Sequence, residues 1–178
     1  MDMEFMELLR RRRSVRLYSE RPVEREKREI LMEAALRSPS SRGINPWRFV
    51  FVEDAAKIEQ VSLCRGHGSG FLRGAPLAVA VFGCEEESDV WVEDCSIASI
   101  VLQLAAESLG LGSCWVQVRN RSRDDGGSSS EYLRKLLGLP SGYSAESVIG
   151  IGYSAESLPP HPFESLEKHK VSLESRSE

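Results

Sequence analysis

Apolar residues run almost unbroken through the middle of the chain, from Trp91 to Trp115. Between Ile97 and Ala106 they cover most of a helical wheel rather than one stripe, which predicts a helix that must be covered on all sides. Gly110 is suited to end this helix. Interrupting polar residues make the run unfit to span a membrane: Glu93, Asp94, Gln103 and Glu107. We expect a central core helix that, in a chain this small, is also the core of a dimer.

The other elements follow from shorter patterns. Helical spacing, with Pro22 as a first-turn residue and Asp54 as an N-cap, predicts helices over 3–13, 22–36, 54–64 and 131–138. Apolar runs, one of them without alternation as in a buried strand, predict strands over 47–53, 76–83, 113–118 and 147–153. Turn-forming residues predict loops over 38–46, 66–70 and 119–130, and the last is the best candidate for a mobile segment.

Strands and helices alternate, which places the chain in the α/β or α+β class. Its 178 residues suit one domain that buries roughly 70% of its unfolded surface. We expect this domain to span residues 1–155. Residues 156–178 are polar, contain Pro159-Pro160, and are expected to form an extended tail without a core of its own.

Composition excludes several classes of function. The net charge of −4 argues against a general polyanion binder, and 41% hydrophobic residues is ordinary for a soluble protein. The four cysteines show no zinc-like spacing, so we expect no metal site and a reducing compartment. The N-terminus lacks a secretory apolar region, so we expect a cytoplasmic protein with neither a nucleic-acid nor a membrane partner.

Basic charge is concentrated near the N-terminus, at Arg10–Arg13 and Arg16. One explanation is structural, because positive charge suits the last turn of the helix predicted there. However, the run from Arg12 to Arg16 is denser than that role requires. Guanidinium forks match phosphate oxygens, and Ser14 adds a hydroxyl donor. A nucleic-acid arm would be expected to interleave aromatic residues, which are absent, so we favour a bound phosphate.

Other motifs do not carry chemistry. Gly150–Ala155 matches G-x-G-x-x-A after a strand, but Pro159 and Pro160 follow where a dinucleotide fold needs a helix. Gly66–Gly70 lacks the Lys-Ser/Thr of a phosphate-binding loop. No serine sits in a nucleophile elbow, and no catalytic triad is evident. A phosphate-type arginine cluster without an acid–base set suggests that a cofactor performs the chemistry.

Five segments, in order, resemble the nitroreductase family of FMN-dependent NAD(P)H oxidoreductases. The similarity covers residues 5 to about 155, and the segments are Arg12–Arg16, Pro22–Ala35, Ser38–Val50, Gly74–Pro76 and Leu104–Trp115. The resemblance implies an α+β fold, with a mostly antiparallel sheet flanked by helices. It also implies an intertwined homodimer with the long central helix at its core and an FMN at each subunit interface.

The resemblance also implies which residues bind the cofactor. Arg12, Arg13, Ser14 and Arg16 would hold the FMN phosphate. Pro39, Ser40, Ser41 and Asn45 belong to a loop that would reach the flavin of the other subunit. His67 and Gly68 would lie near the pyrimidine edge. The backbone of Trp115, Val116 and Gln117 would face the ring, with an N–H directed at flavin N5. No side chain is assigned as a catalytic acid or base.

The sequence departs from the family pattern at Gly43, where Asn is usual, and at Asn45, where Gln is usual. His161, Lys168 and Lys170 are the candidates for the family's basic tail residue. The expected activity is ping-pong transfer of hydride from NADH or NADPH, through flavin N5, to a nitroaromatic, quinone or similar acceptor. The alternatives are other flavin chemistry on this fold (an oxidase, a reductive dehalogenase or flavin breakdown) and a non-enzymatic flavin-binding protein.

Overall fold

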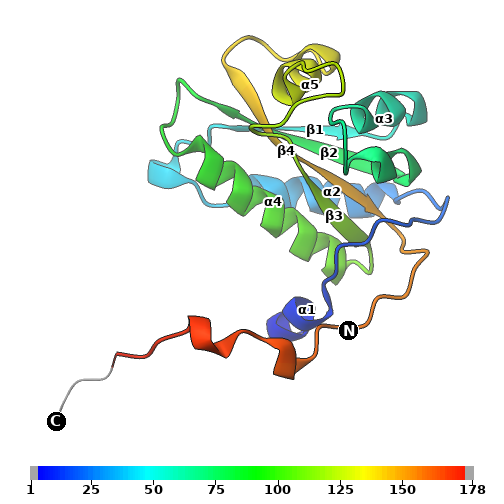
Figure 1. Cartoon of the computed structure of the whole chain (residues 1–178), viewed down its shortest axis with the longest axis vertical. Coiled ribbons are helices and arrows are strands. Elements are labelled where there is room, and N and C mark those ends of the chain that lie inside the picture. Colours follow the sequence, from blue (N-terminus) through cyan, green and yellow to red (C-terminus); the bar gives the residue numbers. More distant parts are fainter. Residues whose placement is uncertain (1–3, 175–178) are drawn as a thin grey trace.

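The computed structural model describes residues 4–174. Its centre is an antiparallel sheet in the order β1-β2-β4-β3, formed by β1 (Trp47–Val52), β2 (Leu77–Cys84), β3 (Gly112–Gln117) and β4 (Tyr143–Gly152). Helices lie on both faces (Figure 1): α1 (Phe5–Arg11), α2 (Arg25–Leu36), α3 (Ala55–Ser62), α4 (Trp91–Ser108) and α5 (Ser129–Leu136). The predicted α+β class with a mostly antiparallel sheet is confirmed.

Helices α2 and α4 pack on one face of the sheet. Alternate residues of β2 and β4 point into this layer, among them Val79 and Ile149, because strand side chains alternate between faces. The α4 residues that meet them recur at helical spacing: Cys95, Ala98, Leu102 and Ala106. Leu31 and Ala35 of α2 complete this core.

Helices α3 and α5, together with a 3₁₀ turn at Gly70–Gly74, pack on the opposite face. The intervening strand residues, such as Ala80 and Phe82, point into this second layer. Strand β2 is therefore buried along its whole length, which confirms the prediction of an unbroken apolar strand at 76–83, shifted by one residue.

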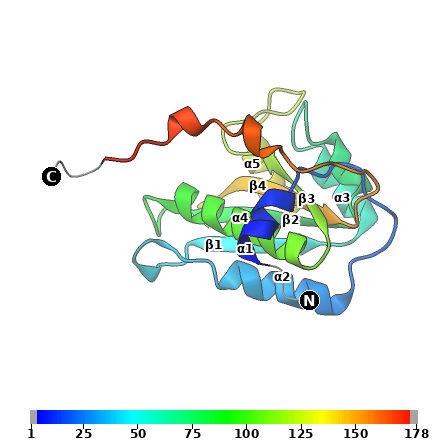
Figure 2. The ribbon, with the colours of Figure 1, turned by 90° about the horizontal axis from the view of Figure 1, so that it is seen from below.

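Helix α4 is the longest helix and lies across the sheet (Figure 2). Its own chain does not cover it completely, since Ile97 and Ile100 on its outer side remain 40% and 39% exposed. This incomplete cover agrees with the expectation that a chain of this size cannot enclose its central helix alone. Among residues 4–174, no helix combines the length and apolar character that crossing a membrane requires.

Several predicted boundaries differ from those of the structure. Helix α2 begins at Arg25 rather than Pro22, because Glu24 is still extended and Val23 enters the core ahead of the helix. Strand β4 begins at Tyr143 rather than Ser147. The apolar run on which the prediction depended begins only after the bulge, whereas residues 143–145 also pair with β2. Helix α1 is shorter than predicted, and Met3, where the predicted helix began, lies outside the described residues.

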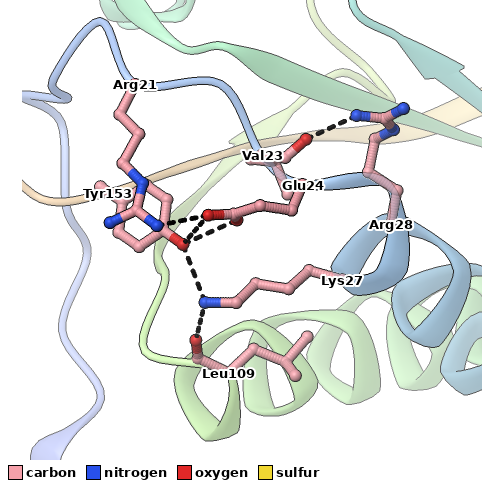
Figure 3. Close-up of polar contacts among 7 residues, drawn as sticks. All are labelled: Arg21, Val23, Glu24, Lys27, Arg28, Leu109 and Tyr153. Carbon is pink, nitrogen blue, oxygen red and sulfur yellow. Dashed lines mark hydrogen bonds and ion pairs between the residues drawn. The ribbon is translucent and has the colours of Figure 1, made fainter.

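A polar cluster joins the start of α2 to the end of α4 (Figure 3). Lys27 donates to the Leu109 carbonyl at 2.7 Å and to the Tyr153 hydroxyl at 2.9 Å. Tyr153 in turn donates to Glu24, which lowers the pKa of that carboxyl to about 2. A lysine at a helix C-terminus satisfies a free carbonyl and complements the helix dipole. The cluster fixes the turn that leads from α4 into β3.

The C-terminal segment leaves the sheet after residue 155 and projects away from the body of the molecule (Figures 1 and 2). It contains two short 3₁₀ turns, Phe163–Ser165 and Lys168–Lys170. Its large apolar side chains remain exposed: Phe163, Leu166, Val171 and Leu173.

Candidate functional site

The arginine-rich segment runs along the outer edge of β3. Ser14 forms a parallel bridge with Ser113, and the Val15 N–H donates to the Ser113 carbonyl at 3.0 Å. The Glu156 carboxylate accepts the backbone N–H groups of Arg16 and Leu17 at 2.6 and 3.1 Å. These backbone hydrogen bonds lower the Glu156 pKa, because they favour its charged form. The segment is therefore held at both its middle and its end.

The extended backbone separates the arginines into two groups. Arg12, Ser14 and Arg16 lie on the side of the segment that faces the Cys114 thiol. Burial raises the pKa of this thiol, and the three groups offset part of that rise. Arg13 donates to the Pro159 carbonyl and lines a different cavity, of about 330 Å³. Three of the four predicted phosphate ligands are thus brought together, and Arg13 is placed apart from them.

Beyond Ser113, the outer edge of β3 offers free backbone groups. Ser113 directs its carbonyl outward to Val15, and strand backbone groups alternate in direction, so the N–H groups of Trp115 and Gln117 point outward as well. Val116 instead turns its backbone toward β4. Within residues 4–174, no strand pairs with this edge. The predicted ring-facing segment therefore carries two outward donors, next to the arginines.

A buried carboxyl supports this edge from beneath. The Trp115 indole N–H donates to Gln117 Oε1 at 3.1 Å, and Gln117 Nε2 lies 3.4 Å from Glu146 Oε1. In the pairing with β2, Val81 faces Ser147 and Phe82 faces Ala145, so Glu146 is the extra residue of a β-bulge. The bulge places its side chain beneath α4, near Ser96.

Glu146 is only 2% exposed, and its Oε2 has no hydrogen-bond partner among the described residues. Burial raises its pKa, and the nearby Ser147, Gln117 and Arg119 offset this only in part. This residue was not predicted from the sequence. A polar pair ahead of an apolar run gave no signal of a bulge, and its charge indicated a surface position.

His67 and Gly68 lie in an exposed loop on the other side of the sheet from α4. The Gly66 N–H donates to the Ser122 carbonyl at 3.3 Å, and a side chain at Gly66 would collide with Asp124 Oδ1 at 2.5 Å. The loop therefore rests on the segment that follows β3. Gly68 has a φ of +85°, which glycine adopts without strain.

The Pro39–Asn45 loop lies at the N-terminal end of α4. The Ser41 N–H donates to the buried Asp94 carboxylate at 2.8 Å. The Ser40 hydroxyl contacts Asn45 twice, at 2.7 Å from Oδ1 and 2.9 Å from the backbone N–H. Gly43 and Asn45 both have positive φ, of 66° and 56°. Asparagine tolerates this conformation, so both positions where the sequence departs from the family pattern serve the turn.

Helix α4 separates the two halves of the predicted site. Ser41 is bonded to Asp94 near the start of the helix, whereas Arg11 pairs with Glu107 near its end at 3.5 Å. At about 1.5 Å per residue, these two positions lie about 20 Å apart along the axis. One chain therefore does not bring the Pro39–Asn45 loop to its own arginine segment.

A family model, a related sequence and a solved structure all point to the same family. The sequence model described as the nitroreductase family matches residues 9–64 and 60–153. A protein of Archaeoglobus fulgidus, provisionally named NADH dehydrogenase/NAD(P)H nitroreductase, is 34% identical over 84% of this chain and 85% of its own. The structure described as an FMN-dependent nitroreductase of Clostridium difficile R20291 is 44% identical, covers 95% of this chain and 98% of that one, and superposes with a TM-score of 0.92. This chain belongs to the nitroreductase family.

Proposed function

We propose that the protein is an FMN-dependent oxidoreductase that takes hydride from NADH or NADPH and passes it to a small acceptor such as a nitroaromatic or a quinone. The observation that carries the proposal is the adjacency of Arg12, Ser14 and Arg16 to the outward N–H groups of Trp115 and Gln117. The similar structure from Clostridium difficile is described as FMN-dependent.

The residues present suit FMN. Two guanidinium groups and a hydroxyl form a donor set that matches a phosphate dianion. The outward N–H groups of β3 suit the nitrogen and oxygen acceptors on one edge of a flavin ring. When bound, FMN supplies a ring that accepts hydride from a reduced nicotinamide and returns it to an acceptor. The protein's part is to anchor the phosphate, orient the ring and present donors to it.

Glu146 and Gln117 have a positioning role in this proposal. The Gln117 amide accepts from Trp115 on one side and donates toward Glu146 on the other. These partners fix the orientation of the amide and therefore of the strand edge that carries the outward N–H groups. None of these side chains is assigned as a catalytic acid or base.

We infer that the working unit is a homodimer, because a second chain can bring the Pro39–Asn45 loop to the arginine segment. Two α4 helices packed antiparallel would place the start of one beside the end of the other. The exposed Ile97 and Ile100 supply an apolar surface for that contact. A cavity of about 790 Å³ along β1 and the exposed apolar residues of the tail are further surfaces that a second chain could cover.

The first test is the visible absorption spectrum of the protein after incubation with FMN and removal of the unbound flavin. The proposal predicts a retained flavin spectrum close to one FMN per chain and bleaching when NADH or NADPH is added without oxygen. A protein that retains no flavin contradicts the cofactor assignment. Retained flavin that neither nucleotide bleaches contradicts the assigned donor.

A further inference from the structure

A polar cavity of about 470 Å³ opens at the end of β3, just beyond the Trp115–Gln117 edge. Its walls come from the starts of α4, α5 and β4 and from the loop after β3. Three arginines, two aromatic rings and two carboxylates are among its lining residues: Arg119, Arg121, Arg134, Trp91, Tyr143, Glu85 and Glu131. This volume is within the range of small-molecule sites.

The arginines of this cavity differ from those on the surface of α2 in their lack of acidic partners. Arg25 and Arg37 each pair with a glutamate one turn away, at 2.7 Å. Among residues 4–174, Arg119, Arg121 and Arg134 form no ion pair. The Arg119 guanidinium lies 6.0 Å from the centre of the Trp91 ring, and Arg134 is half-buried. Three like charges around one cavity repel one another unless an anion lies between them.

The two carboxylates offset this positive charge only in part. Glu131 pairs with Lys135 at 2.6 Å, and this contact lowers the Glu131 pKa. Glu85 accepts a hydrogen bond from the Ser144 hydroxyl. Three guanidinium groups against the one carboxylate of Glu85 leave the cavity with a net positive charge. Arg134 donates to the Leu139 carbonyl at 3.4 Å, whereas Arg119 and Arg121 form no side-chain hydrogen bond among residues 4–174.

We propose that this cavity binds the phosphate groups of the nicotinamide dinucleotide, an inference that rests on the proposed function. Arg119 lies in the turn two residues beyond Gln117, so the two Cα atoms are at most about 7 Å apart. A dinucleotide with its nicotinamide at the β3 edge can therefore reach the cavity with its phosphates. The half-buried Tyr143 offers ring surface to its adenine, and the guanidinium groups match either the pyrophosphate or a 2′-phosphate.

The test uses FMN-loaded protein carrying Arg121→Ala, Arg134→Ala or both, with Arg25→Ala as the matched surface control. Arg119 is left intact because its guanidinium lies beside the Trp91 ring and its charge lowers the pKa of Glu146. Stopped-flow reduction of the flavin gives an apparent Kd and a limiting rate for NADPH and for NADH. We expect each cavity variant to raise the apparent Kd roughly tenfold or more, with an unchanged limiting rate. Reduction by dithionite should be unchanged in all variants.

The two nucleotides distinguish the phosphate that is bound. Weaker binding of NADPH alone assigns the cavity to the 2′-phosphate, and weaker binding of both assigns it to the pyrophosphate. Apparent Kd values that do not change in the double variant overturn the proposal.

Calorimetric titration with 2′,5′-ADP and 5′-ADP gives a readout that does not depend on turnover. Binding to the FMN-loaded wild type that is lost in the double variant supports the cavity, even if neither nucleotide reduces the flavin and the proposed function fails. No binding of either compound to the wild type overturns the cavity assignment, whatever the flavin does.

Discussion

Arg12 and Arg16 project from the same side of an extended segment, because side chains two and four residues apart share a face. Replacing both by alanine removes two charge-assisted contacts to a phosphate. At about 1.5–3 kcal/mol each, their loss should weaken FMN binding by about a hundredfold or more. Fluorescence titration of the apoprotein with FMN measures this. Arg25→Ala should bind like the wild type, and unchanged affinity in the double variant would contradict the phosphate assignment.

Glu146 is expected to make stability depend on pH. Its pKa is raised in the folded state by burial, so the folded protein holds this proton at pH values where the unfolded chain has released it. The contribution of Glu146 to the free energy of unfolding is therefore fully present below about pH 4.5, the ordinary pKa of a glutamate. It is lost as the pH rises through the pKa of the folded state. Glu146→Gln, which does not ionise, should melt progressively higher than the wild type as the pH is raised from 5 to 8.

Glu131→Gln is the control for that experiment, because Lys135 lowers the Glu131 pKa and gives a dependence of the opposite sign. Its stability contribution is present above the unfolded pKa and is lost as the pH falls. Thermal melts in a series of buffers separate the two cases. A Glu146→Gln difference that does not change with pH would show that this carboxyl stays ionised throughout.

Arg12, Arg16 and Glu146 also show how far sequence reasoning reaches. Arg12 and Arg16 were predicted because their charge density exceeds what a helix end requires, and that excess is visible in one short stretch. Glu146 was not predicted, because its burial depends on a bulge, which is a property of the pairing between β2 and β4. The separation of Arg13 from the other arginines likewise depends on which side of the chain meets β3.

Among the elements, the contact between α2 and α4 should be sensitive to Lys27. Lys27→Met removes the hydrogen bonds to the Leu109 carbonyl and the Tyr153 hydroxyl while keeping the length of the side chain. We expect a loss of about 2 kcal/mol in the free energy of unfolding, since a partly buried carbonyl loses a charged donor. Urea denaturation measures it. Lys135→Met, which breaks an exposed pair, should cost no more than about 0.5 kcal/mol.

Most elements were predicted because their patterns are local. The Asp54 N-cap is confirmed by its bond from the Lys57 N–H at 2.8 Å, and the buried strand β2 required only an apolar run. The errors occur where a tertiary contact overrides the local pattern. Val23 continued the spacing of α2, but the core takes it in before the helix begins.

At the scale of the whole molecule, the outer side of α4 is the surface to test. Ile97→Glu places a charge on the surface assigned to the dimer, at a position that is 40% exposed in the single chain. We expect the chain to fold, as judged by circular dichroism, but to run as a monomer in light-scattering chromatography and to lose FMN. Leu63→Glu, at an equally open position after α3, is the control and should leave the assembly intact. A flavin-loaded Ile97→Glu monomer would contradict the shared site.

The sequence predicted only that some apolar surface of the central helix would lack cover from its own chain. A helix that is apolar nearly all round needs more cover than a chain of 178 residues supplies, but the pattern does not say which residues stay open. The structure identifies them. It also shows that the tail contacts the arginine segment through Glu156 and Pro159, whereas its large apolar residues from Phe163 onward stay exposed.

Ser41 and Arg11 lie about 20 Å apart along the axis of α4. This separation has a thermodynamic consequence. A ligand that touches both chains of a dimer binds only the assembled form, so its binding free energy is added to the association free energy. Reciprocally, dilution below the dissociation constant of the apoprotein dimer should release flavin even when each chain remains folded. Flavin occupancy would then depend on protein concentration as well as on FMN concentration, and added FMN would hold the two chains together.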